Sequence, residues 1–490
     1  MRFCIIFIFI FINLNAKANF DFNANCIRAY KNILSLKLNS ARTLIIAEKK
    51  KNPENAIPYL LDNYVDYFTL LTTENKTDFE KLKNSKLSRL SRIENDDRNS
   101  PYYLFAQAEI NLQLAISRGR FQEYFTSAIE INRAFNQLQE NSQKFPSFLP
   151  NQKGLGMINA ILGSVPDGLK RTMSTFGIRG NTNNGLRMLK NLVAKLPDSR
   201  YSQFYEEAVF YLAYIQTDIL NDADAYSKIL ANTQAVDPES LLRTYIIANA
   251  AIKMGRNQDA INALSKKPVG DEYQPYPYLD YLMGLAKIHA LNNSASGSLI
   301  SYLNTYKGVN FIKDAYLNLA WLELLKGNVK GYKSYVQQVK TKGYTYHEKD
   351  KQALSEANDP IPDLSLLKAR LFFDGGYYEK ALENIADKKM DGFKTLRDKI
   401  EYCYRQGRIY DETAKDEFAL KFYQFAIDLG KNERYYFASN AALRIASIYE
   451  KNKDMTKARQ YYDTAVNMNN HDYENSIENK AKEGLRRISN

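Results

Sequence analysis

The chain has 490 residues, of which 67 are Lys or Arg and 55 are Asp or Glu, giving a formal net charge of +12. This length allows a large apolar core, while a content of only three cysteines excludes a disulfide-stapled fold. Basic and acidic residues are interleaved, and no nucleic-acid recognition module is visible. The composition therefore predicts a mixed-charge surface with a cationic bias, and no binding of nucleic acid.

A secretory signal peptide is predicted at residues 1–18. Arg2 precedes ten apolar residues, Phe3–Ile12, and an Ala16-Lys17-Ala18 cleavage motif follows. The apolar run is shorter than the ~20 residues of a membrane span, and an uncleaved anchor is the alternative. We therefore expect an exported bacterial protein, either periplasmic or at the inner face of the outer membrane.

Two cysteines, Cys26 and Cys403, remain after the predicted cleavage. Whether they pair stays open at this point. Cys403 occupies a buried-type helical position, which favours a small apolar core residue over a disulfide partner.

Apolar residues recur at helical spacing in several segments, clearest in Tyr102–Ser117, Tyr205–Ile219 and Leu241–Ile252. No stretch shows sustained strand alternation. The sequence therefore predicts an all-α fold. The expected helix ends are marked by Gly255, Asn292-Asn293, Gly327 and Gly331.

The segment 145–196 is rich in glycine and differs from its surroundings. Gly154-Leu155-Gly156 precedes an apolar helix expected at Met157–Val165, and a short helix is expected at Leu169–Ser174. The further elements are Phe176-Gly177, Gly180-Asn181 and a helix from Gly185-Leu186. This pattern resembles the tetratricopeptide repeat 39 and inclusion-body-clearance family, except that Asn181 replaces the acidic residue expected there.

The apolar helix of this segment has two interpretations. A buried helix that plugs or joins the fold is favoured. The alternative is a helix that lies in a membrane surface, with Lys170-Arg171 as its basic flank.

The C-terminal part contains a helical repeat with a period of 39 residues. A small residue, an aromatic three later and an Ala–aromatic–Ala set recur with the same spacings. The first copy is Gly407, Tyr410, Ala419, Tyr423 and Ala426, and the second is Ala446, Tyr449, Ala458, Tyr462 and Ala465. Small residues let two antiparallel helices approach closely, and the aromatics fill the space beside them.

These residues resemble the tetratricopeptide repeat family. Weaker copies start near Ala369, Tyr316 and Ile247, while Lys368 and Gln406 stand where Leu is expected, so the number of repeats stays open. The resemblance implies a right-handed α-solenoid of helix pairs. We expect a signal peptide at 1–18, N-terminal helical repeats at 19–144, the Gly-rich helical module at 145–196 and a tetratricopeptide-like superhelix at 197–490.

In that family the first helix of each pair lines a concave groove that contacts peptides. Carrying its positions onto this chain implies a partner groove. Its candidate residues are Arg370, Tyr404, Arg405, Arg408 and Arg444, together with Ser447. Arginines and a tyrosine favour an acidic or C-terminal peptide. The alternative is that these arginines neutralise neighbouring acids such as Asp411 and Glu412.

No catalytic, cofactor or metal motif accompanies the repeats. The three histidines, His289, His347 and His471, lack metal-ligand spacing, and no nucleophile elbow or phosphate-binding loop is present. The sequence therefore predicts a noncatalytic scaffold or adaptor of the cell envelope with a protein or peptide partner. A lipid or membrane-surface binding protein that uses the Gly-rich module is the alternative, and the oligomeric state stays open.

Overall fold

The computed structural model describes residues 20–164, 180–220, 222 and 224–489. Over these ranges the chain forms α-helices, three short 3-10 or π turns and connections, and no strand. The predicted all-α solenoid is confirmed.

The N-terminal half comprises α1 (Ala24–Leu34), α2 (Leu38–Lys51), α3 (Ile57–Thr73), α4 (Lys76–Glu94), α5 (Pro101–Arg120), α6 (Tyr124–Lys144), α7 (Asn151–Ser164), α9 (Thr182–Lys195), α10 (Tyr205–Tyr214), α11 (Ala225–Thr233) and α12 (Leu241–Lys253). The remainder comprises α13 (Asn257–Ser265), α14 (Tyr278–His289), α15 (Ala295–Thr305), α16 (Ile312–Leu325), α17 (Val329–Thr341), α18 (Glu348–Glu356), α19 (Leu364–Asp374), α20 (Tyr378–Glu383), α21 (Leu396–Glu412), α22 (Asp416–Gly430), α23 (Phe437–Lys451), α24 (Met455–Asn467) and α25 (Glu474–Ile488).

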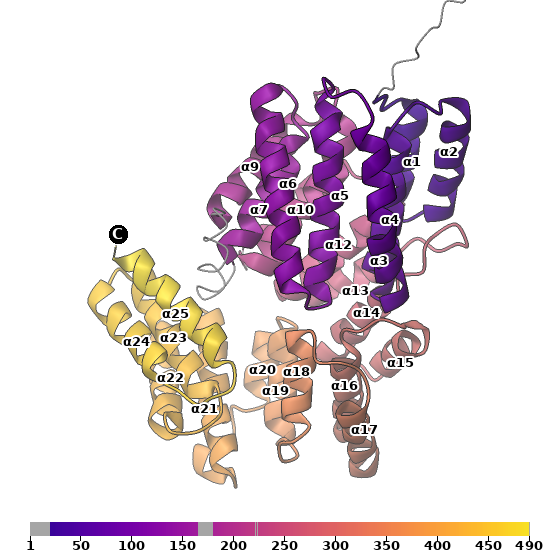
Figure 1. The fold of residues 1–490 in the computed structure, drawn as a ribbon. Coiled ribbons are helices and arrows are strands. Elements are labelled where there is room, and N and C mark those ends of the chain that lie inside the picture. Colours follow the sequence, from indigo (N-terminus) through magenta and orange to yellow (C-terminus); the bar gives the residue numbers. More distant parts are fainter. Residues whose placement is uncertain (1–19, 165–179, 221, 223, 490) are drawn as a thin grey trace, which may run out of the picture.

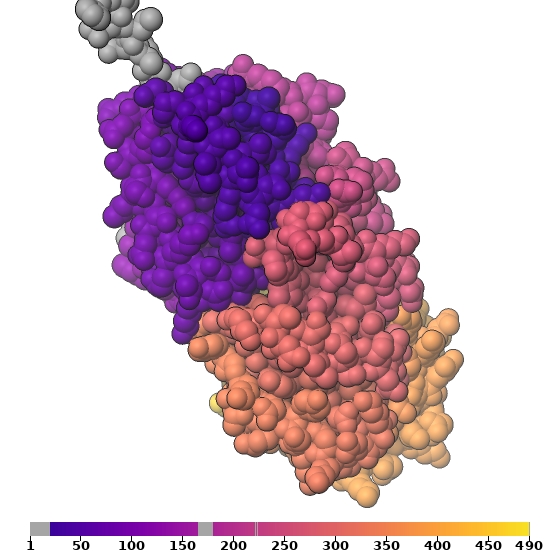
Figure 2. All heavy atoms as spheres, turned by 90° about the vertical axis from the view of Figure 1, so that its right-hand side faces the viewer, coloured from indigo at the N-terminus to yellow at the C-terminus, as the bar shows by residue number. Residues whose placement is uncertain are grey.

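Most helices pack against their neighbours in sequence, as the helix pairs of a solenoid do (Figure 1). Helices α1–α10 form one thick end of the molecule, α14–α20 follow, and α21–α25 form a separate block that lies below α7 and α9 in Figure 1. Figure 2 shows that the molecule is elongated, with the N-terminal helices (indigo) at one end and the orange residues toward the other.

Two large hydrophobic cores hold the described part of the solenoid together, and α19 contributes to both. The first core runs from Cys26 to Leu371 and includes the buried residues of α7 and α9. The second runs from Leu366 to Ala481. Because Leu366 packs in the second core and Leu371 in the first, α19 joins the two parts through its opposite faces.

The two cysteines lie in different cores. Cys26 and Cys403 are each 1% exposed, and both are free. Burial raises the pKa of each thiol to about 12, which keeps both protonated at neutral pH. The prediction that Cys403 is a small apolar core residue is confirmed, and the two thiols do not form a disulfide.

Most predicted helices lie where expected, although one of the glycines expected to end a helix does not do so. The segments Tyr102–Ser117 and Leu241–Ile252 fall within α5 and α12, and a π turn at Ile215–Ile219 continues α10. Gly255 and Gly327 adopt positive φ angles directly after helices. Gly331 does not end a helix: it lies in the first turn of α17, where the side chain of Asn328 accepts its backbone N–H at 2.9 Å.

In the Gly-rich module, α7 begins at Asn151, earlier than the expected Met157, and contains Gly154 and Gly156. These glycines fit because neighbours occupy the space of a side chain: a Cβ on Gly154 would lie 2.6 Å from Leu138 Cδ1. A Cβ on Gly185 would lie 2.4 Å from the carbonyl oxygen of Gly156. Gly154 therefore lets α7 pack closely on α6, and Gly156 and Gly185 let α7 and α9 pack backbone to backbone.

Several expectations fall outside the described residues. They are the signal peptide at 1–18, the short helix at Leu169–Ser174, Phe176-Gly177 and the basic flank Lys170-Arg171.

Candidate functional site

The C-terminal repeat packs as its small residues predict. Ala419, Ala446 and Ala458 are fully buried. A Cβ on Gly407 of α21 would lie 2.5 Å from the ring of Tyr423 on α22. Close pairing of this kind stacks α21, α23 and α25 side by side, with α22 and α24 between them in sequence. Most of the predicted groove residues therefore lie on adjacent helices.

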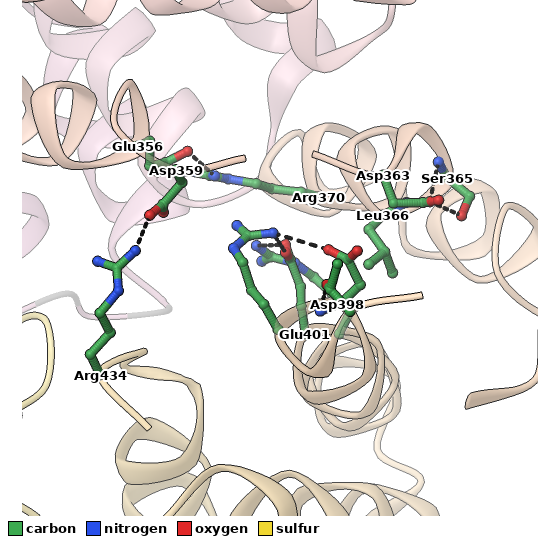
Figure 3. Close-up of polar contacts among 12 residues, drawn as sticks. Glu356, Asp359, Asp363, Ser365, Leu366, Arg370, Asp398, Glu401 and Arg434 are labelled. Atoms are coloured by element: carbon green, nitrogen blue, oxygen red, sulfur yellow. Dashed lines mark hydrogen bonds and ion pairs between the residues drawn. The ribbon is translucent and has the colours of Figure 1, made fainter. Parts of the chain in front are cut away.

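Arg370 of α19 is engaged within the protein. Its two terminal nitrogens donate to the two carboxylate oxygens of Glu356 at 2.8 and 3.0 Å (Figure 3). The guanidinium also lies 4.7 Å from the ring centre of Trp321. This bidentate pair and the stacked ring fix α19 to α18 and α16, and they satisfy the charge of Arg370.

Arg405 of α21 is buried, with 5% of its surface exposed. Its Nε and Nη2 donate to Glu401 Oε1 at 3.1 and 2.9 Å, and Arg397 adds an ion pair at 3.0 Å to the same carboxylate. Burial alone would raise the pKa of Glu401, but the two arginines hold it below its usual value.

The ion pairs of Arg370 and Arg405 enclose almost no free space. The gap between Glu356, Arg370, Arg405 and Tyr436 measures about 20 Å³. Such a gap admits a single water-sized group and no peptide. At these two positions the interpretation that the arginines neutralise neighbouring acids agrees with the contacts.

Tyr404 and Arg408 pack against each other. Tyr404 is 1% exposed, and its hydroxyl accepts a hydrogen bond of 3.1 Å from Arg408 Nη1. The Arg408 guanidinium stacks 4.5 Å from the ring centre of Phe373, and its Nη2 lies 3.7 Å from Glu412. Tyr404 therefore packs beneath Arg408 and has almost no exposed surface with which to contact a partner.

Arg444 of α23 differs from the other predicted residues. It is half-buried, and within the described part of the chain its guanidinium has no hydrogen bond or ion pair. Lys480 of α25 is exposed and equally without a partner among the described residues. Although the side chain as a whole is exposed, desolvation of its ammonium first, and then the charges of Arg444 and Arg408, lower the pKa of Lys480, while Glu483 opposes them. Arg408, Arg444 and Lys480 thus form a cationic stripe across α21, α23 and α25.

Lys480 was missed in the sequence because residues 474–488 do not repeat the spacings of the two clear copies. Only an indirect argument from the sequence leads to the helix that carries Lys480. A solenoid needs a final helix to cover its last pair, and α25 does so with Gly484, whose Cβ would lie 2.3 Å from the Tyr462 ring.

A large hollow lies beside the stripe. It measures about 1290 Å³ and separates α25 from the ends of α7 and α9 and from α18. Lys480 and Glu483 line one wall, and Gly163 and Thr182 line another. One end of the cationic stripe is therefore open to a large space.

None of the helices in the described ranges is long and apolar enough to cross a membrane. Within those same ranges, no three or more His, Cys, Asp or Glu side chains are grouped to hold a metal ion.

One family matches part of the chain. Residues 439–472, which include most of α23 and all of α24, match the tetratricopeptide repeat. No curated protein matches the chain. The matched residues coincide with the second clear copy of the 39-residue repeat, so the chain is supported as a tetratricopeptide-type repeat protein with a helical solenoid fold, a class that generally mediates contacts between proteins.

Proposed function

We propose that this tetratricopeptide-type protein is a noncatalytic scaffold that binds an acidic segment of a partner protein on the cationic stripe. The observation that carries the proposal is the pair of neighbouring cations, Arg444 and Lys480, that make no hydrogen bond or ion pair with any described residue. The nearest acidic influences are Asp411 on Arg444 and Glu483 on Lys480. The other predicted arginines, Arg370 and Arg405, serve the internal structure.

The stripe has the chemistry for a carboxylate ligand. Arg444 presents a planar fork of donors, and Lys480 adds a compact charge on the next helix. Desolvation first, and then repulsion from Arg444 and Arg408, disfavour the charged form of Lys480 in the unliganded protein and lower its pKa. An incoming carboxylate would relieve this repulsion, which gives the bound state an electrostatic gain.

The scaffold is proposed to act in a bacterial cell envelope, either in the periplasm or at the inner face of the outer membrane. The motif at 1–18 supports export. Mass spectrometry of the protein from its source cell tests this part: a mature chain that begins at Asn19 is expected, and an intact Met1 would contradict it.

The relationship to the tetratricopeptide repeat 39 and inclusion-body-clearance family is also a proposal. It is supported by the role of Gly156 and Gly185, whose missing side chains allow the α7–α9 contact, and of Gly154, which lets α7 approach α6.

The alternative of membrane-surface binding through α7 is not favoured by the contacts. Met157, Ile158, Ala160 and Leu162 are at most 5% exposed. A helix that binds a membrane surface presents its apolar face to the lipid, and this face is occupied by the first core.

A direct test measures peptide binding by fluorescence anisotropy. The probes are two labelled decapeptides with the same Gly-Ser spacing, one with five Glu and one with five Lys. We expect saturable binding of the Glu peptide that weakens at high salt, and its loss in a variant with Arg444→Glu and Lys480→Glu.

The matched control carries Lys421→Glu and Arg459→Glu, two exposed residues of α22 and α24. It has the same change of charge at a different surface. Equal loss in both variants would reduce the effect to overall charge, and equal binding of the Lys peptide would contradict the proposed site.

A further inference from the structure

A second hollow lies inside the N-terminal part of the solenoid, away from the cationic stripe. It measures about 460 Å³, and its walls come from α3, α5, α7, α10, α12, α14 and the segments 306–311 and 346–349. Small-molecule sites in proteins have volumes of about 300–1,000 Å³. The cavity is therefore large enough for a small organic molecule, and it is formed by residues that lie far apart in the sequence.

Aromatic rings form one continuous wall of this cavity. Tyr245 lies 5.8 Å from Tyr276 and 6.1 Å from Tyr278, measured between ring centres. Phe311 lies 5.0 Å from Tyr278 and 4.3 Å from the ring of His347. Flat rings at these spacings provide a rigid apolar surface that suits another flat ring.

Several hydroxyl groups on this wall have no partner. Within the described ranges, Tyr245, Tyr276 and Tyr278 make no hydrogen bond through their hydroxyls, although all three line the cavity. Tyr211 Oη and Asn310 Oδ1 are buried and also unpartnered. Buried polar atoms are usually satisfied, so the tyrosine hydroxyls are unused donors for a ligand with acceptor oxygens, while Asn310 Oδ1 is an unused acceptor.

The charges at the cavity favour an anion. Glu74 pairs with Arg120 and accepts hydrogen bonds from Tyr306 at 2.8 Å and Asn310 at 3.0 Å. These contacts fix the carboxylate and neutralise it.

A second acid–base pair and one further cation complete the lining. Asp218 pairs with Lys253 at 3.3 Å, while the ammonium of Lys349 has no hydrogen bond or ion pair with any described residue. Burial lowers the pKa of His347 to about 4, so that it is neutral at pH 7. The lining thus carries three basic groups against two acidic ones.

We propose that this cavity binds a small organic acid that combines a flat ring with a single carboxylate. The ring would stack on the wall formed by Tyr245, Tyr278 and Phe311, and the carboxylate would face Lys349. The tyrosine hydroxyls would donate to its acceptor oxygens. This site is separate from the peptide site proposed above, and neither depends on the other.

A cationic ligand fits these observations less well. Both acidic groups at the cavity already have basic partners. The charge of Lys349 also lowers the pKa of Asp314, but that carboxyl group accepts a hydrogen bond from Tyr281 at 2.7 Å. The unpaired charge at the cavity is positive.

Three probes with the same ring body test the proposal by titration calorimetry on the full-length protein. They are 2-naphthoate, 2-naphthalenemethanol and 2-naphthylmethylammonium. We expect one saturable site for naphthoate, with an affinity at least about ten-fold higher than that of the ammonium probe. Lys349→Ala should remove this preference and leave binding of the neutral alcohol unchanged.

Two further variants serve as controls. Lys351→Ala changes an exposed lysine of the same helix, which pairs with Glu348, and it should bind all three probes like the wild type. Tyr278→Phe keeps the ring and removes only the hydroxyl, so it should weaken naphthoate modestly without unfolding the protein.

The proposal would be overturned by the absence of saturable naphthoate binding up to low-millimolar concentration. It would equally be overturned by an ammonium probe that binds as tightly as naphthoate, or by a Lys349→Ala variant that weakens all three probes alike.

Discussion

Lys153 shows at the scale of one residue how the N-terminal part is locked together. Its ammonium lies 2.6 Å from Glu109 and 2.6 Å from Glu207, and it donates to the hydroxyl of Tyr64 at 2.8 Å. All three charged side chains are fully buried. Burial and the repulsion of Glu207 raise the pKa of Glu109, although Lys153 opposes both. One buried cation therefore links α5, α7, α10 and α3.

Replacing this cation should be strongly destabilising. Lys153→Met keeps the length of the side chain but leaves two carboxylates buried without a counter-charge, so the free energy of unfolding should fall by about 3–5 kcal/mol. Urea denaturation measures it. Lys190→Met, at an exposed position of α9, should change stability by less than about 0.5 kcal/mol. Similar small losses in both variants would contradict the structural role of Lys153.

His289 provides a test of pH dependence. It lies in the last turn of α14 and is 8% exposed, and burial lowers its pKa from 6.5 to about 4. In the unfolded chain the imidazole takes up a proton near pH 6.5, while in the folded protein it does so only near pH 4. Stability is therefore lost as the pH falls through this window.

The His289→Leu variant removes this titration. When the pH is lowered from 7 to 4.5, the free energy of unfolding of the wild type should fall by about 2 kcal/mol more than that of the variant. Chemical denaturation at a series of pH values measures it. A difference that stays constant from pH 7 to 4.5 would show that the buried histidine is not held neutral.

At this scale the sequence indicated only part of the candidate site. Arg444 and Arg408 were found because the repeat placed them on first helices of helix pairs. The burial of Tyr404 and Arg405 was not predictable from the pattern, because their acidic partners and aromatic neighbours depend on how closely successive helices pack. Lys153 and its two carboxylates carry no local signal, since 44 and 54 residues separate the partners.

The elements depend on small residues where helices cross. Gly185 of α9 meets the backbone of α7, and a Cβ there would lie 2.4 Å from Gly156 O and 2.7 Å from Ala160 N. Backbone atoms cannot move aside as a flexible side chain can, so the two helices would have to separate.

Gly185→Ala should therefore lower the free energy of unfolding by about 1–3 kcal/mol. Gly297→Ala is the matched control, because Gly297 lies in α15 and nothing approaches the position of its Cβ within 4 Å. That change should be neutral or stabilising by up to about 1 kcal/mol. Urea denaturation of both variants measures the contrast, and equal stabilities would contradict the close α7–α9 contact.

The helices themselves were largely predictable, because their apolar spacing and their terminal glycines are local features. The expected start of the apolar helix at Met157 is wrong, because α7 begins at Asn151 and contains Gly154 and Gly156. In the structure a tight helix crossing requires glycine at both positions. Gly331 was expected to end a helix, but it lies in the first turn of α17, which Asn328 caps.

At the scale of the whole molecule, two cores share α19, and two candidate sites lie in different parts of the solenoid. The repeat in the second core could be read from the sequence, because neighbouring helix pairs repeat the same contacts. The cavity of the first core could not, since Glu74 and Tyr306, whose hydrogen bond helps to form it, are 232 residues apart. Contacts between residues this far apart leave no periodic pattern in the sequence.

The cationic stripe of α21, α23 and α25 is proposed to bind a partner protein. The most direct measurement is a crosslinked pull-down from the envelope of the source cell, with identification of the captured proteins by mass spectrometry. It compares wild type, a variant with Arg408→Glu, Arg444→Glu and Lys480→Glu, and a control with Lys421→Glu, Lys431→Glu and Arg459→Glu on α22, α24 and the connection after α22. We predict one partner with an acidic segment, captured by wild type and control and lost in the stripe variant. Capture of the same partner by all three proteins, or of none by the wild type, would contradict partner binding on the cationic stripe.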